Sequence, residues 1–202
     1  MAGLSTTLPQ NLRALMEEGR VEQALAELSH CEIGAREGRG ATALHITPCP
    51  DELVRRLVER GEDINAADDH GRRPLHERAC WAHKDQIGLL LELGAEVDAP
   101  DEHGRTPLHI AAEGLCPPAV DAFLTAGADP SRRATRWYKK YNAITFALRG
   151  GANHQLPSML EIVERFLAAG ARPTGAEATF LTPMSKDYQR LLAQRRRDGK
   201  DT

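Results

Sequence analysis

The sequence has few aromatic residues, few cysteines and no long apolar run. Its 202 residues include two Trp, three Tyr, four Phe and four Cys. The cysteines Cys31, Cys49, Cys80 and Cys116 lie far apart, which excludes the CxxC pairs of a zinc or redox centre and a dense disulfide framework. No stretch reaches the about 18 to 20 apolar residues of a membrane span. Residues 1–10 carry no basic residue, so we expect no secretory signal and a cytoplasmic protein. In that reducing compartment we expect the cysteines to be free thiols.

Motifs of catalysis are also missing. The sequence contains no Gly-rich phosphate-binding loop, no GxSxG and no HExxH. The adjacent Asp68 and Asp69 fall in a predicted exposed turn, without the apolar surroundings that make a carboxyl a general acid. We therefore predict a protein that is not an enzyme and that takes no cofactor, no metal and no small-molecule substrate.

Charge is unevenly distributed along a chain whose net charge is only −3. Residues 51–103 contain 14 acids and 7 bases, whereas residues 131–150 contain six bases and no acid. The split suggests one acidic and one basic surface; the alternative is two solvated faces without a function. The small net charge argues against nucleic acid as a partner of the whole protein. Bases and aromatics interleave at 132–141, which leaves a nucleic-acid element there as an alternative.

The strongest pattern is an internal repeat of 33 residues. The segment GRRPLH at 71–76 recurs as GRTPLH at 104–109, and a weaker copy, GATALH, occupies 40–45. A second marker, a glycine that opens a polar turn, is present at 61–65 and again at 94–98. A period of this length, built from a turn and two helices, is typical of an ankyrin solenoid. The sequence resembles the ankyrin-repeat family.

Local chemistry supports the same pattern. Pro74 and Pro107 suit the first turn of a helix, where the missing N–H has no partner to lose, and Thr106 suits the N-cap position. Apolar residues at helical spacing, as in 53–58, predict a second helix in each unit, which a glycine such as Gly94 ends in the left-handed region. Pairs of short helices bury their apolar faces only by stacking on one another.

The resemblance implies one all-α domain over residues 1–202: an ankyrin solenoid of about four helix-turn-helix repeats with short β-hairpin-like fingers between two caps. The N-terminal cap is a helix pair broken at Gly19. The fourth repeat carries about ten extra residues, before Asn142 and between its two helices. The proposed bounds are 1–34 for the N-terminal cap, 35–66, 67–99 and 100–130 for three repeats, 131–175 for the irregular repeat, and 176–202 for the C-terminal cap and basic tail.

In the ankyrin family, specificity lies on the concave side, at the finger tips and the exposed positions of each first helix. Both Trp and two of the three Tyr fall on these positions, and aromatics beside Arg are typical of binding hot spots. The alternative is that Trp137 and Tyr138 fill a gap in the irregular repeat. The first repeat contributes Arg36, Gly38, Arg39 and Ala41. The main candidates for partner binding are Asp69, His70, Arg72, Trp81, Glu102, His103, Arg105, Glu113, Trp137, Tyr138, Lys139, Tyr141 and Arg149.

The resemblance also implies roles for the histidines. His45, His76 and His109 end the TPLH-like motifs, and in the family this side chain hydrogen-bonds neighbouring turns. We therefore expect structural roles for these three rather than a metal site. His70 and His103 are expected at exposed finger tips.

The implied function is binding of another protein in the concave groove. A composition rich in Ala, Arg, Leu and Gly is like that of a bacterial protein, and small bacterial ankyrin proteins resemble immunity proteins that neutralise a cognate toxin. An acidic groove would suit a basic toxin such as a nuclease. The alternative is a scaffold or adaptor, including a secreted effector that mimics a host adaptor. Nucleic acid and membrane are not expected partners.

Overall fold

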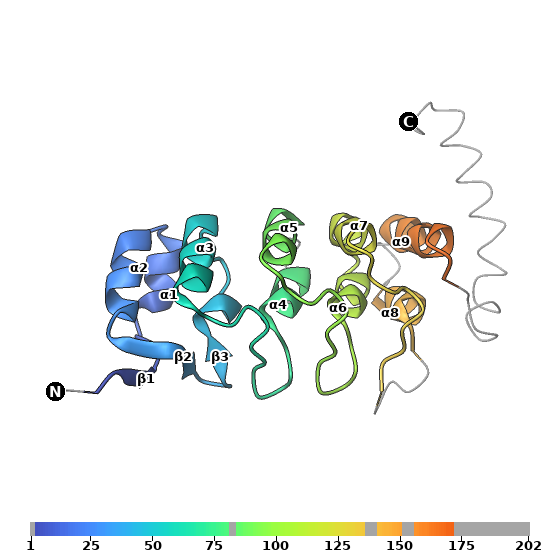
Figure 1. Cartoon of the computed structure of the whole chain (residues 1–202). Coiled ribbons are helices and arrows are strands. Elements are labelled where there is room, and N and C mark those ends of the chain that lie inside the picture. Colours follow the sequence, from blue (N-terminus) through green and yellow to red (C-terminus); the bar gives the residue numbers. More distant parts are fainter. Residues whose placement is uncertain (1–2, 81–83, 136–140, 151–155, 172–202) are drawn as a thin grey trace.

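A computed structural model describes residues 3–80, 84–135, 141–150 and 156–171, in which the helices form two rows (Figure 1). Loops extend away from one row, called here the finger row. Its members are α1 (Leu12–Glu17), the 3₁₀ turn η1 (Ala43–His45), α4 (Pro74–Cys80), α6 (Pro107–Glu113) and α8 (Ala143–Gly150). The outer row consists of α2 (Val21–Leu28), α3 (Asp51–Arg60), α5 (Lys84–Glu92), α7 (Pro117–Thr125) and α9 (Leu156–Ala168).

Each helix from α4 onward packs against its partner in the other row and against the next helix in its own row. One apolar core therefore runs the length of the molecule, from Leu12 in α1 to Phe166 in α9. This is the helical repeat solenoid expected from the sequence. The prediction that these helices begin at a proline is confirmed, because α4 begins at Pro74 and α6 begins at Pro107.

The ends of the helices also follow the expectation. The N-terminal helix pair is broken at Gly19, between α1 and α2. Gly94 follows α5 with a φ of 97°, a left-handed conformation that costs a side chain with Cβ about 1 kcal/mol or more. Cys31, Cys49 and Cys116 are buried free thiols, as predicted, whereas the side chain of Cys80 lies outside the described residues.

A three-stranded sheet near the N-terminus departs from the all-α prediction. Its strands are β1 (Ser5–Thr7), β2 (Cys31–Glu37) and β3 (Ala41–Thr42), in the order β1-β2-β3. The antiparallel β2–β3 hairpin is the first finger, but the parallel pairing of β1 with β2 was not predicted. All three residues of β1 are exposed, so the segment has no apolar alternation by which a sequence reading could recognise it.

The first unit lacks a full helix in the finger row. η1 has three residues, whereas α4 and α6 have seven each. Pro48 and Pro50 follow within five residues of its end; they have no N–H, and each disfavours the helical conformation in the residue before it. The chain therefore leaves the helix after one turn and crosses to α3.

Arg78 is a charged side chain buried completely in the core. It occupies the place that Ala111 takes 33 residues later in α6. Its Nε, Nη1 and Nη2 atoms have no hydrogen-bond partner within the described part of the chain. Burial lowers the pKa of Arg78, while the nearby Cys49, Glu77 and Asp51 act in the opposite direction. A buried cation without a hydrogen-bonded partner destabilises the folded state.

We expect Arg78→Met to increase the free energy of unfolding by about 1–4 kcal/mol, because methionine fills a similar volume without a charge to desolvate. Urea denaturation measures the change. Arg78→Ala is the control, since it removes the charge but leaves a cavity, and should be less stable than Arg78→Met. A methionine variant less stable than the natural chain would contradict this.

Leu108 in α6 has no exposed surface, and it packs in the core that neighbouring helix pairs share. We expect Leu108→Ala to lower the free energy of unfolding by about 2–5 kcal/mol through lost apolar contacts and the cavity that remains. The matched control is Leu167→Ala in the outer-row helix α9, where the residue is 41% exposed and the expected change is within about 0.5 kcal/mol. Equal effects at both positions would contradict the packing seen here.

Candidate functional site

The second and third fingers are each closed by an aspartate. The Asp68 N–H donates to the Arg72 carbonyl (2.8 Å), and Asp68 Oδ1 accepts from the N–H groups of His70 and Arg72, both at 2.8 Å. Asp101 makes the same bonds in the next finger. Asp68 is half-buried and Asp101 is buried, so the exposed turn predicted for Asp68 is corrected: only its neighbour Asp69 is exposed.

Successive fingers are joined to one another through the backbone. The pairs, donor N–H first, are Asp69 with Arg39 (2.9 Å), Glu102 with His70 (2.9 Å) and Thr135 with His103 (2.8 Å). Gly71 permits the close approach, because a Cβ there would lie 2.8 Å from the Glu102 nitrogen. Gly104 has the same role beside Thr135, at 2.5 Å. The fingers therefore form one connected edge along the solenoid, and their side chains are held at fixed spacing.

The motif histidines fasten the fingers to the finger row. In His76, Nδ1 accepts from the Arg73 N–H (3.1 Å) and Nε2 faces the Arg105 carbonyl (3.1 Å). His109 and His45 make the corresponding bonds to the carbonyls of Arg132 and Arg72, both at 3.0 Å. A carbonyl only accepts, so Nε2 carries the proton and the ring is neutral. The structural role predicted for these residues is confirmed.

Burial makes protonation of these rings unfavourable. It lowers the pKa of His76 and of His109 from the ordinary 6.5 to about 4, and it lowers the pKa of His45 as well. A second proton on the ring would also remove the acceptor that Nδ1 offers to the backbone N–H.

We expect the protein to lose stability as the pH falls from 6.5 toward 4, because in this window the unfolded histidines bind protons and the folded ones do not. The stabilisation from His76 and His109 is complete above pH 6.5, and each adds a slope of up to about 1.4 kcal/mol per pH unit. Urea denaturation between pH 7 and 5 measures it. His109→Gln should reduce the slope, because it removes one of the buried rings; a flat profile in the natural chain would refute the assignment.

Several predicted binding residues converge on the second and third fingers. His70 Nδ1 lies 3.0 Å from Glu102 Oε1, and His103 Nε2 lies 3.7 Å from the same oxygen. His70 is exposed as predicted, whereas His103 is half-buried. Two fingers that are 33 residues apart therefore present a joint cluster of histidine and glutamate side chains.

Two of the predicted arginines, Arg72 and Arg105, are engaged within the chain. Arg72 Nη2 lies 3.1 Å from Glu77 Oε1, and both side chains are half-buried. Arg105 Nε donates to Asp101 Oδ2 (2.8 Å), and Arg105 Nη1 lies 3.7 Å from Glu113, an exposed residue at the end of α6. These ion pairs hold the finger side chains against the helices, so the arginines also stabilise the face on which they lie.

The aromatic candidates are placed only in part. Tyr141 is half-buried, with its ring edge-on to Phe146 at 6.0 Å between centroids, so it packs on the core as well as reaching the surface. The structure places Arg149 in α8 without describing its side chain. The remaining candidates lie outside the described residues: Trp81, Trp137, Tyr138 and Lys139.

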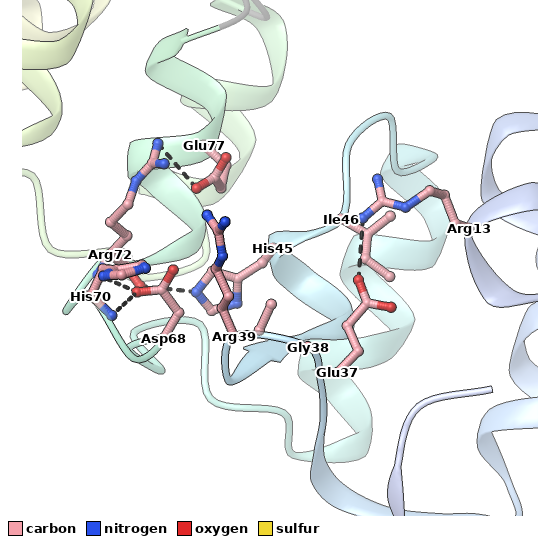
Figure 2. Close-up of a pocket in the computed structure, with 11 residues that line it drawn as sticks. Arg13, Glu37, Gly38, Arg39, His45, Ile46, Asp68, His70, Arg72 and Glu77 are labelled. Atoms are coloured by element: carbon pink, nitrogen blue, oxygen red, sulfur yellow. Dashed lines mark hydrogen bonds and ion pairs between the residues drawn. The ribbon is translucent and has the colours of Figure 1, made fainter. Parts of the chain in front are cut away.

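A polar hollow of about 320 Å³ opens between the β2–β3 hairpin and the second finger (Figure 2). Five residues predicted on the binding side line this hollow: Gly38, Arg39, Ala41, His70 and Arg72. The other lining residues were not predicted, because they come from distant elements without a common motif: Arg13 in α1, Glu37 in β2, His45 and Ile46 at η1, Asp68 in the second finger and Glu77 in α4.

The hollow suits binding better than acid–base chemistry. Its carboxylates already accept bonds within the chain, and both nitrogens of His45 are bonded. Within the described parts of the chain, no group of three or more His, Cys, Asp or Glu side chains is arranged to hold a metal ion. The hollow and the neighbouring fingers offer side chains that are held in place and open to a partner's surface.

Stacked helix pairs with hydrogen-bonded fingers and an open polar face define a helical repeat protein. The chain belongs to the ankyrin-repeat family: the family model for ankyrin repeats in three copies matches residues 12–101 and, overlapping them, 50–134. Ankyrin repeats are generally protein–protein interaction modules. A search of curated proteins found no match. Of the helices described, none is long and apolar enough to cross a membrane.

Proposed function

We propose that this chain binds a partner protein, without catalysis, on its finger-side face, formed by the fingers together with α4 and α6. The observation that carries the proposal is the joining of successive fingers by backbone hydrogen bonds, which holds His70, Glu102 and His103 in one cluster. Side chains that are already ordered lose little entropy on binding, so a partner gains affinity from each contact.

We further propose that the partner is a basic toxin such as a nuclease, and that the chain acts as a bacterial immunity protein in the cytoplasm. Asp69, Glu102 and Glu113 support a basic partner, because all three lie on the finger-side face. They would pair with bases that hold the toxin's own substrate.

A scaffold or adaptor is the second candidate, and the placement of the acidic segment favours it. Many exposed acids of residues 51–103 lie on α3 and α5 in the outer row, away from the fingers: Asp51, Glu52, Glu59, Asp85 and Glu92. The acidic face toward a finger-side partner is therefore narrower than the sequence suggests.

A photo-crosslinking amino acid at two matched positions tests the docking face. The side chain of Glu113 is 45% exposed at the end of α6, and Leu167 is 41% exposed on the outer-row helix α9. In cells of the native host we expect an adduct with another protein from position 113 and none from position 167. Adducts from position 167 alone would place the partner on the outer row and refute the proposal.

The protein captured in the adduct separates the two candidates. For an immunity protein, an equimolar amount of this chain should abolish the enzymatic activity of the captured toxin, and the inhibition should weaken when Glu113 is replaced by lysine. For an adaptor, the captured protein should keep its activity in the complex. Mass spectrometry of the adduct followed by an activity assay distinguishes these outcomes.

A further inference from the structure

The carboxylates around the hollow are bonded within the chain, two of them in ion pairs and the third to backbone N–H groups. Glu37 Oε1 lies 3.2 Å from Arg13 Nη2, and Glu77 Oε1 lies 3.1 Å from Arg72 Nη2. Asp68 accepts two backbone N–H groups through Oδ1. Each lining carboxylate thus has a donor from within the chain.

Arg39 is the exception. It lies at the turn of the β2–β3 hairpin, and its guanidinium has no ion pair or hydrogen bond with any residue that the structure describes. Figure 2 shows the side chain rising from the hairpin into the hollow, toward Glu77 and Arg72. Glu77 is already held by Arg72, and Asp68 is bonded to backbone N–H groups, so the Arg39 guanidinium has no carboxylate partner among the described residues.

The backbone beneath Arg39 is fixed. Its carbonyl accepts the Asp69 N–H at 2.9 Å, which ties the hairpin to the next finger. Gly38 and Gly40 on either side have φ values of 46° and 76°, so the tight turn depends on residues without a Cβ. The guanidinium therefore projects from a rigid base into a hollow that is open to a partner.

We propose that this hollow is a docking notch for the carboxylate of an Asp or Glu side chain on the partner protein, with Arg39 as its ion-pair donor. A planar guanidinium binds a carboxylate through two parallel N–H bonds, which sets direction as well as charge. The proposal rests on the proposed function, because the acid comes from the protein that binds the finger-side face.

The notch also predicts a charge pattern on the partner. Asp69, adjacent to the notch, calls for a base on the partner, whereas Arg39 calls for an acid. A partner that fits presents one carboxylate beside a basic patch, and a uniformly basic surface would leave Arg39 unmatched.

A nuclear magnetic resonance titration of the full chain tests the notch with small probes. The carboxylate probe is N-acetyl-glutamate α-amide, the neutral control is N-acetyl-glutamine α-amide, and inorganic phosphate is a third arm. We expect saturable shifts of the backbone amide signals of residues 38–41 and 68–72 with the carboxylate probe only. The dissociation constant should be on the order of millimolar, as expected for a single ion pair.

Two variants decide the role of Arg39. Arg39→Met should weaken binding of the carboxylate probe about tenfold or more, because it removes a charged donor. Arg20→Met, which removes another exposed arginine remote from the hollow, should leave the titration unchanged. Equal shifts with the neutral probe, binding of phosphate without binding of the carboxylate, or an unaltered titration in Arg39→Met would each overturn the notch.

Failure here is separable from failure of the proposed function. If the crosslinked partner still forms its adduct at position 113 but binds Arg39→Met as tightly as the natural chain, the notch is refuted and finger-side binding stands. If no adduct forms at position 113, the proposed function fails whatever the small probes show.

Discussion

The bridge that a buried imidazole makes between two backbone groups is the interaction on which this structure depends. In His76 and His109, one ring nitrogen accepts the N–H that opens a helix, and the other donates to a carbonyl of the next finger. Each ring thereby ties one repeat to its successor. Because each ring must stay neutral for this, it couples the whole stack to pH.

The same bridges position the candidate binding face. A finger that is fastened at its base by a histidine and at its side by the preceding finger has little freedom to move. His70 and Glu102 can therefore meet across two fingers, and His70 lines the same hollow as Arg39. The residues of the finger-side face are therefore held in fixed positions by contacts that recur from one repeat to the next.

The arginines of the face show why a candidate site cannot be read completely from sequence. Arg72 and Arg105 were predicted as contacts for a partner, and each forms an ion pair with an acid of its own chain. Tyr141 was assigned to the groove, and it packs partly on Phe146. Exposure and charge at a position depend on which neighbours the fold supplies, and residues such as Arg13 and Glu77 reach the hollow from separate elements without a motif in common.

The repeat, the two rows of helices, the left-handed glycines and the structural histidines were all determined by sequence alone. They depend on local chemistry that recurs every 33 residues: proline at a helix start, glycine at its end, and an imidazole three residues after its N–H partner. The parallel strand β1, the burial of Arg78 and the unmatched charge of Arg39 were decided by the tertiary structure. Each of these depends on contacts between segments remote in sequence, and no local pattern encodes such contacts.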